Sequence, residues 1–193
     1  MAQSDTVDRI LHAATVLFAE RGFAETSLRT ITSMADVNLA AVNYHFGTKK
    51  ALIQAVFVRY IKPLCAELDK RLDEYEREKT EHQKPSTEVL LEILFEAHQS
   101  TVLHLNDKSQ RLVRLISLAY TQSQEHLRQN LSGSYGDTYH RYTNLLKSAL
   151  PHLNPVQFYW RLNFLLGSAI FTLSSFDSFH NCEWVFKCRP LRE

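Results

Sequence analysis

Apolar residues in the first part of the chain recur at intervals of three and four, which is the period of an amphipathic α-helix. This stripe comprises Val7, Ile10, Leu11, Ala14, Leu17 and Phe18. Gly22 follows as a candidate C-cap, and Phe23 is the apolar residue that commonly folds back onto the last turn. The pattern therefore predicts one helix that ends at Gly22.

A second, short helix is predicted immediately afterwards. Either Thr26 or Ser27 offers a side-chain oxygen to its first free amides, as N-cap residues do. Its expected inward face consists of Leu28, Ile31, Met34 and Ala35. The turn that follows, Asp36-Val37-Asn38, needs a residue in the left-handed region, and aspartate can adopt that region although glycine does so best.

A third helix is expected from Leu39 to Phe46, with Asn38 as its N-cap. Val42 and Phe46 are four positions apart, so they share a face and anchor the helix above Val37. The remaining side chains are predicted to face outward: Leu39, Ala40, Ala41, Asn43, Tyr44 and His45. This outer face has small residues at its start and hydrogen-bonding residues behind them.

The rest of the chain also shows helical periodicity. A fourth helix is expected after a Thr48 cap, and Pro63 is predicted to kink or interrupt it. The polar segment 74–87 is interpreted as a frayed helix end followed by a loop. Further helices are expected at about residues 87–105, 108–121, 123–131, 135–150 and 155–176. Residues 133–136, Gly-Ser-Tyr-Gly, are interpreted as a helix break rather than a phosphate-binding loop.

These elements predict an all-α protein with two parts. An N-terminal three-helix helix-turn-helix domain spans residues 1–47, and the start of a linker helix covers residues 48–63. A C-terminal helical ligand-binding and dimerisation domain spans residues 64–193. The chain has 193 residues, 45% of them hydrophobic, with only five Gly and five Pro, so it can bury a core.

The outer face of the third helix suits the major groove of DNA. That groove admits one α-helix, and small side chains at the N-terminal end let it approach the bases, where methyl groups can contact thymine. Asn43 can pair with a base or with a phosphate. Tyr44 and His45 are better placed for backbone phosphates. The second helix can add phosphate contacts from Arg29 and Ser27.

Lys49 and Lys50 fall in the first turn of the fourth helix, where cations oppose the helix dipole. Helix stability therefore does not account for lysines at these positions, whereas contact with a DNA phosphate would account for them. The simpler interpretation is that both lysines are solvated surface, and short helix pairs are common in themselves. The joint order of cap, helix, turn, cap, helix and Lys-Lys favours contact with DNA.

The overall charge changes this picture little. The chain carries a formal net charge of +1, and residues 1–63 contain seven Lys/Arg and five Asp/Glu. The basic excess is slight, so affinity for DNA would depend on where the charges lie and on two copies acting together. The chain as a whole is not a polycation.

Several other classes of protein are disfavoured. The longest uncharged, apolar-leaning run, residues 162–176, is shorter than the roughly 20 residues that span a bilayer. Charged residues interrupt the N-terminus before any signal-like stretch, so we expect a cytoplasmic protein without a membrane partner. The odd number of cysteines, three, suits a reducing compartment.

No catalytic residue and no cofactor is expected, because no standard hydrolase, kinase, nucleotide-binding or zinc-protease signature occurs. His180, Cys182 and Cys188 fit no common zinc spacing, and three ligands are incomplete. The sequence therefore predicts neither an enzyme nor a metal site.

The first sixty or so residues resemble the N-terminal domain of the TetR family of bacterial transcriptional regulators, in the opening ILHAATVLFAERGF and the close NYHFGTKKALIQAVF. The resemblance implies base-proximal roles for Arg29, Leu39, Ala40, Ala41 and Asn43. It implies phosphate contacts for Ser27, Tyr44, His45 and Lys49. Asp36 departs from the glycine often seen at the family's turn. The implied partner is a palindromic double-stranded operator bound by a homodimer whose readers lie roughly 34 to 36 Å apart.

The C-terminal part is where a signal would be received. Its candidate inward residues are Leu91, Leu94, Phe95, His98, Val102, Leu112, Leu115, Ile116, Ala119, Tyr139, Tyr142 and Leu146. Most simply, these residues form a core. The segments LISLAYTQSQEHLRQNL and PVQFYWRLNFLLGSAIFTLS resemble the fatty-acid-responsive PsrA-type subgroup of the family.

That resemblance implies a repressor released from DNA by a small hydrophobic effector, a long-chain fatty acid or acyl thioester. An apolar tunnel with few charges would suit an acyl chain, with Arg114, His98 or Tyr139 as head-group partners. The expected ligand-binding residues are Phe95, His98, Val102, Arg114, Leu115, Tyr139 and Tyr142. The alternative is a DNA-bound adaptor that recruits or blocks a protein partner without any small ligand.

Dimer contacts in the family come from the last two long helices. One is plain in this sequence, from Pro155 through Trp160 to Leu173, with Gly167-Ser168-Ala169 permitting close approach. The second is not apparent, because after Phe179 the chain reads HNCEWVFKCRPLRE, which we interpret as too short and irregular for a long interface helix. We therefore expect a weaker or differently packed dimer than the family norm.

Overall fold

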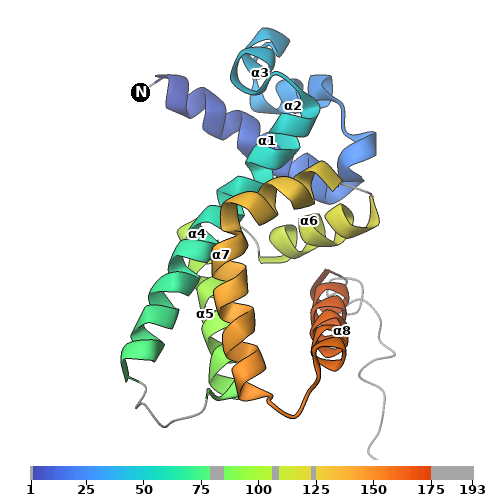
Figure 1. The fold of residues 1–193 in the computed structure, drawn as a ribbon. Coiled ribbons are helices and arrows are strands. Elements are labelled where there is room, and N and C mark those ends of the chain that lie inside the picture. The colour runs from blue at the N-terminus through green and yellow to red at the C-terminus, as the bar shows by residue number, and fades with distance from the viewer. Residues whose placement is uncertain (1, 79–84, 106–108, 123–124, 175–193) are drawn as a thin grey trace, which may run out of the picture.

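The computed structural model describes residues 2–78, 85–105, 109–122 and 125–174, and within these ranges the chain is helical with no strand (Figure 1). The prediction of an all-α fold is confirmed. The helices are α1 (Ala2–Glu25), α2 (Leu28–Ala35), α3 (Leu39–Phe46), α4 (Lys49–Glu78), α5 (Thr87–His104), α6 (Ser109–Thr121), α7 (Glu125–Ala149) and α8 (Pro155–Ser174).

The middle of α1 is buried on all sides. Every residue from 13 to 19 is buried, although the sequence predicted a stripe on one face only. The reason is tertiary, because α2 and α4 pack on α1 and α6 packs on it as well. The helix therefore has no solvent face over this stretch.

The first helix changes direction at Gly22, as its C-cap role predicts. Gly22 has φ 84° and ψ 168°, a backbone conformation that is nearly restricted to glycine. Phe23 then turns inward and its ring packs edge-on against Phe18, with 5.3 Å between ring centroids. The chain resumes a helical turn to Glu25 before α2 begins.

The fourth helix is continuous through Pro63, so of the two outcomes predicted there, a kink or an interruption, the interruption is wrong. Proline removes one helical hydrogen bond, but α4 packs against α1, α5 and α7 along its length, and this packing holds the helix together. The helix also extends to Glu78, so residues 74–78, the start of the segment expected to fray, are helical.

Two clusters of buried side chains form the interior. The first core joins α1–α3 and the first half of α4 to α6 and the start of α7, through Leu112, Leu115, Ala119 and Leu127. It therefore crosses the expected domain boundary. The second core joins the C-terminal half of α4 to α5, α7 and α8, and comprises Leu68, Leu72, Leu90, Ile93, Ala97, Tyr142, Leu146 and Phe158.

On α5, Val102 is buried as predicted, but the rest of the buried face lies about one residue before the predicted positions. Its buried positions are Leu90, Ile93, Ala97, Thr101 and Val102. Phe95, expected to face inward, is 60% exposed. Apolar residues occur on several sides of this helix, so periodicity does not single out one face. The small side chains of Ala97 and Thr101 suit the close packing of α5 on α4.

The seventh helix is a single element, so the predicted break at residues 133–136 is wrong. Figure 1 shows that α7 bends into two arms, an upper arm near α6 and a lower arm beside α4 and α5. Tyr142 and Leu146 are buried as expected, whereas Tyr139, also expected inside, is 49% exposed. On α6, the expected inward positions Leu112, Leu115 and Ala119 are buried.

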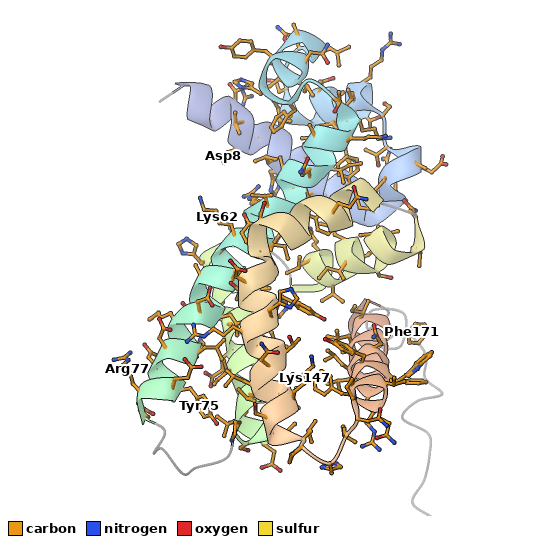
Figure 2. The ribbon with its side chains drawn as sticks, viewed as in Figure 1. Asp8, Lys62, Tyr75, Arg77, Lys147 and Phe171 are labelled. Atoms are coloured by element: carbon orange, nitrogen blue, oxygen red, sulfur yellow. The ribbon has the colours of Figure 1, made fainter. Side chains whose placement is uncertain are left out.

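The eighth helix contacts α6 and reaches the second core through Phe158. Lys147 on α7 donates to the Tyr159 hydroxyl at 2.8 Å, and Figure 2 shows it pointing toward α8. Phe171 projects from α8 on the side away from α7 (Figure 2). The residues after 174, including the expected irregular tail, lie outside the described residues.

Candidate nucleic-acid interface

The start of α2 is capped by Ser27, which settles the choice between the two candidates. The Ser27 Oγ accepts a hydrogen bond from the Thr30 amide at 3.0 Å. Thr26 is instead buried, and its hydroxyl lies 3.1 Å from the Leu17 carbonyl and 2.8 Å from the Gly22 carbonyl. Thr26 thus holds the corner between α1 and α2 closed, while Ser27 stays at the surface.

The turn after α2 has the left-handed residue that the sequence predicted. Asp36 adopts φ 51° and ψ 53°, and the Val37 amide donates to the Thr32 carbonyl at 3.1 Å. Arg9, from α1, donates to the Ala35 carbonyl at 3.1 Å and to the Asp36 carbonyl at 3.2 Å. Sequence reasoning missed this role of Arg9, because the partners lie 26 and 27 positions apart and leave no local signal.

The third helix has the predicted bounds and anchor. The Asn38 side chain accepts from the Ala41 amide at 2.8 Å, and Val42 is buried in the first core. Of the predicted outer residues, Leu39, Ala40, Asn43 and Tyr44 are exposed, whereas Ala41 and His45 are half-buried. Tyr44 is the most prominent, with 77% of its surface exposed.

The inward face of α2 differs from the prediction at one position. Ile31 and Ala35 are buried and Leu28 packs on the first core, but Met34 is 48% exposed. Met34 is six positions after Leu28, about 240° around a helix with 3.6 residues per turn, so it cannot share that face. Thr32, four positions after Leu28, is buried in its place.

The start of α4 lies beside these two helices. The Thr48 Oγ1 accepts from the Ala51 amide at 3.1 Å, which confirms it as a cap. Lys49 is half-buried, and its ammonium donates to the Ala24 carbonyl at 3.4 Å. Lys50 and, on α2, Arg29 are exposed. Figure 1 shows α2 and α3 together at one end of the molecule, far from α8.

The expected ligand-binding residues are not brought together around one cavity. Leu115 lies in the first core and Tyr142 in the second. Val102 is buried, Phe95 and Tyr139 are exposed, and His98 is half-buried. Arg114 donates to the Glu20 carbonyl of α1 at 3.5 Å and so lies at the contact between α6 and α1.

Two of these residues have altered ionisation. Burial lowers the pKa of His98 below its usual value, which favours the neutral imidazole. Burial raises the pKa of Tyr142, whose hydroxyl donates to the Leu90 carbonyl at 2.9 Å. Tyr142 therefore links α7 to α5 rather than facing a free cavity.

An apolar groove does occur, but elsewhere. It has a volume of about 90 Å³ and lies between α5, α7 and α8, with Leu91, Leu146, Phe158 and Leu162 in its wall and Arg161 beside them. A larger open groove of about 330 Å³ lies in the N-terminal part of the chain, between α1, α2 and α4. Neither groove is lined by the seven expected ligand residues.

Other chemistry is sparse in the described part of the chain. Burial, with the nearby Asp69 carboxylate, raises the pKa of the Cys65 thiol, which disfavours the reactive thiolate. No group of three His, Cys, Asp or Glu residues there could hold a metal ion. His180, Cys182 and Cys188 lie outside the described residues. No helix in the described ranges is both long enough and apolar enough to cross a bilayer.

Two protein-family models match this chain, one in its N-terminal part and one in its C-terminal part. Residues 10–56 match the family described as bacterial regulatory proteins, tetR family. Residues 100–184 match the tetracyclin repressor-like C-terminal domain. The N-terminal match contains α2, the turn, α3 and the start of α4, which are the elements of the candidate interface.

Two curated relatives agree. The probable HTH-type transcriptional regulator YttP of Bacillus subtilis is 26% identical over 127 residues, which are 66% of this chain and 56% of YttP. The HTH-type transcriptional repressor Rv3405c of Mycobacterium tuberculosis is 57% identical over 47 residues, 24% of this chain and 25% of that protein. The matches thus span about half of one relative and a quarter of the other. Both are named as regulators rather than enzymes, as the sequence predicts for this chain.

Solved structures show the same fold. The fatty acid degradation regulator FadR from Bacillus halodurans matches with a TM-score of 0.59 over 92% of this chain and 86% of that chain. The identity is 16%, so this likeness shows the fold alone. The two domain matches together span residues 10–56 and 100–184, most of the chain, and with the curated relatives they show that the chain belongs to the TetR family of bacterial regulatory proteins.

Proposed function

We propose that this protein is a sequence-specific regulator of transcription that inserts α3 into the major groove of double-stranded DNA. The observation that carries the proposal is the exposed face of α3 at one end of the molecule, bounded by Ser27 on α2 and by the lysines of α4. A helix of this kind fits the groove, and its N-terminal residues contact the base edges.

The exposed residues divide into two roles. Leu39, Ala40 and Asn43 face the bases, where apolar groups contact the thymine methyl and an amide pairs with adenine. Tyr44, Arg29 and Lys50 are exposed around this face and contact phosphates, which fix the register of the helix without reading sequence. Ala41, His45 and Lys49 are half-buried. In this proposal their side chains extend less far toward the DNA than those of the exposed residues.

The proposal is tested by selecting bound duplexes from a random pool and measuring Kd for the selected duplex over a range of salt concentrations. Lys50→Ala is expected to weaken binding and to reduce the slope of log K against log salt by about one, because one released counterion is lost. Lys62→Ala is the matched control, since Lys62 is also exposed on α4 but lies well below α3 (Figure 2). Equal slopes for the two variants would contradict the proposed interface.

We further propose that the active form is a homodimer built on α8. The support is an exposed apolar surface on this helix: Val156, Tyr159, Trp160, Phe164, Leu165 and Phe171. Patches of this kind mark interfaces, and two-fold operators require two readers one helical turn apart. Sedimentation of the wild type and of a Trp160→Ser, Phe164→Ser double variant tests this, with dissociation expected only in the variant.

We also propose, as the PsrA-type resemblance implies, that the protein is a repressor. Its effector in this proposal is a long-chain fatty acid or acyl thioester, which releases it from its operator. The support for this effector is the apolar groove between α5, α7 and α8, with Arg161 available for an acidic head group. At about 90 Å³ this groove is smaller than the roughly 300–1,000 Å³ of most ligand pockets. Binding of a long chain would therefore displace α8.

Titration of oleate or oleoyl thioester into the complex with the selected duplex tests this effector. Release at micromolar ligand supports it, and retention of DNA at saturating ligand refutes it. The adaptor alternative predicts a different result in a thermal-shift screen. A ligand-gated regulator gains stability from its effector by mass action, whereas an adaptor does not respond to metabolites.

A further inference from the structure

The C-terminal end of α6 contacts the corner between α1 and α2 directly. Gln122 continues the last turn of α6, since its amide donates to the Leu118 carbonyl at 2.9 Å. Its side-chain Oε1 accepts a hydrogen bond from the Phe23 amide at 3.0 Å, between residues 99 positions apart. A Cβ built on Gly22 would lie 2.8 Å from the Gln122 Nε2, so the side-chain amide occupies the space that a Cβ would need.

The same corner holds the side chains that the proposed interface uses. The Ala24 carbonyl accepts from the ammonium of Lys49, at the start of α4. The Thr26 hydroxyl donates to the Gly22 carbonyl at 2.8 Å, and Ser27 follows it directly. Residues 22–27, which we call the corner, thus contact the end of α6 on one side and lead to two candidate phosphate ligands on the other.

Aromatic packing fixes the corner to the interior as well. The Phe23 ring lies 5.3 Å from the Phe18 ring of α1 and 6.1 Å from the Phe57 ring of α4, measured between centroids. The ring and the amide of Phe23 are therefore held by different parts of the molecule. Displacing α6 would pull on the amide while the ring stays packed against Phe18 and Phe57.

We propose that Gln122 is a positioning residue for DNA binding, which sets the corner so that Ser27 and Lys49 meet the phosphate backbone. This inference rests on the proposed function. It assigns the coupling between the two domains to the contact of α6 with the corner. Gln122 binds the amide of Phe23, and Lys49 binds the carbonyl of the next residue, Ala24. The two side chains are therefore connected through two adjacent residues of the corner.

The test compares Gln122→Met, which keeps the length of the side chain but lacks the amide oxygen, with Gln122→Glu, which retains an acceptor. Gln129→Met is the matched control, because Gln129 is exposed on α7. Gln122→Met is expected to bind the selected duplex about three- to tenfold more weakly, the effect of losing one ordinary hydrogen bond. Gln122→Glu should restore binding to within about twofold, and Gln129→Met should match the wild type.

Two further readouts separate positioning from a general loss of stability. Exchange of the Phe23 amide hydrogen should accelerate in Gln122→Met and not in Gln122→Glu. In a double-mutant cycle, Lys49→Ala should cost less DNA affinity in the Gln122→Met background than in the wild type, because coupled residues are not additive. Gln122→Ala provides the same comparisons if the methionine variant does not fold.

Wild-type binding matched by Gln122→Met within twofold, or an additive cycle with Lys49→Ala, would overturn the inference while leaving the proposed function intact. A wild-type chain that selects no duplex at all would overturn the proposed function and the inference together. Reduced binding in Gln122→Met, rescue by Gln122→Glu and non-additivity with Lys49→Ala would support the inference.

Discussion

Replacing Gly22 with alanine tests the packing of the corner without touching any proposed DNA contact. Gly22 has φ 84° and ψ 168°, a region that costs a side-chain-bearing residue about 1–3 kcal/mol. The new Cβ would also lie 2.8 Å from the Gln122 Nε2. Because that atom ends a flexible side chain, Gln122 can move aside.

If Gln122 moves, the Phe23 amide loses its acceptor. An ordinary hydrogen bond contributes about 0.5–1.5 kcal/mol to stability, so with the backbone strain we expect Gly22→Ala to lower the free energy of unfolding by about 2–4 kcal/mol. For a chain of this size each kcal/mol shifts Tm by about 2–4 °C. The expected fall in Tm is therefore roughly 4–16 °C.

Thermal unfolding followed by circular dichroism or calorimetry measures this effect. Gly133→Ala is the matched control, since Gly133 lies inside α7 with nothing within 4 Å of the added Cβ. Alanine is favoured over glycine by about 0.5–1 kcal/mol in a helix, so the control should be slightly stabilised. A Gly22→Ala variant within about 0.5 kcal/mol of the wild type, the range of ordinary surface substitutions, would refute the reasoning.

Three further substitutions probe other parts of the structure. Tyr142→Phe removes the hydroxyl that donates to Leu90 at 2.9 Å, and denaturant unfolding should show a loss of about 0.5–1.5 kcal/mol; an unchanged midpoint would contradict the bond. Asp36→Gly removes the steric cost of holding a side-chain-bearing residue in the left-handed region, at φ 51°. The Tm should therefore not fall, and the free energy of unfolding should rise by up to about 1 kcal/mol. Burial lowers the folded-state pKa of His98, so the unfolded chain takes up its proton first as the pH falls. The free energy of unfolding should therefore decline below about pH 6.5, more steeply for the wild type than for His98→Gln, and parallel curves would exclude this contribution.

The sequence alone determined the elements of the candidate interface. Asp36, Asn38 and Thr48 act on backbone groups a few positions away, so their types indicate the turn and the starts of α3 and α4 wherever the segment is placed. At the start of α2 the sequence left Thr26 and Ser27 open, and the burial of Thr26 decided in favour of Ser27. The bounds of α3 follow from the same local chemistry. The anchoring role of Val42 also follows from the sequence, because so short a helix can present only one face to the core.

The tertiary structure decided which faces are buried and where helices continue. Met34 and Phe95 are apolar but exposed, because a partner helix covers a different side. The helix through Pro63 and the uninterrupted α7 persist because packing outweighs local propensity. Sequence reasoning weighs each segment separately and cannot include these contacts.

The joint between the two domains is the clearest case of what the sequence leaves open. Gln122 and Arg9 are polar residues on helix surfaces, and nothing near either of them marks it as the partner of a distant backbone group. Their hydrogen bonds form only when α6 and α2 are packed on α1. Local chemistry therefore determined the DNA-reading helix, whereas the contacts that position it arose from folding, which brings together residues far apart in the chain.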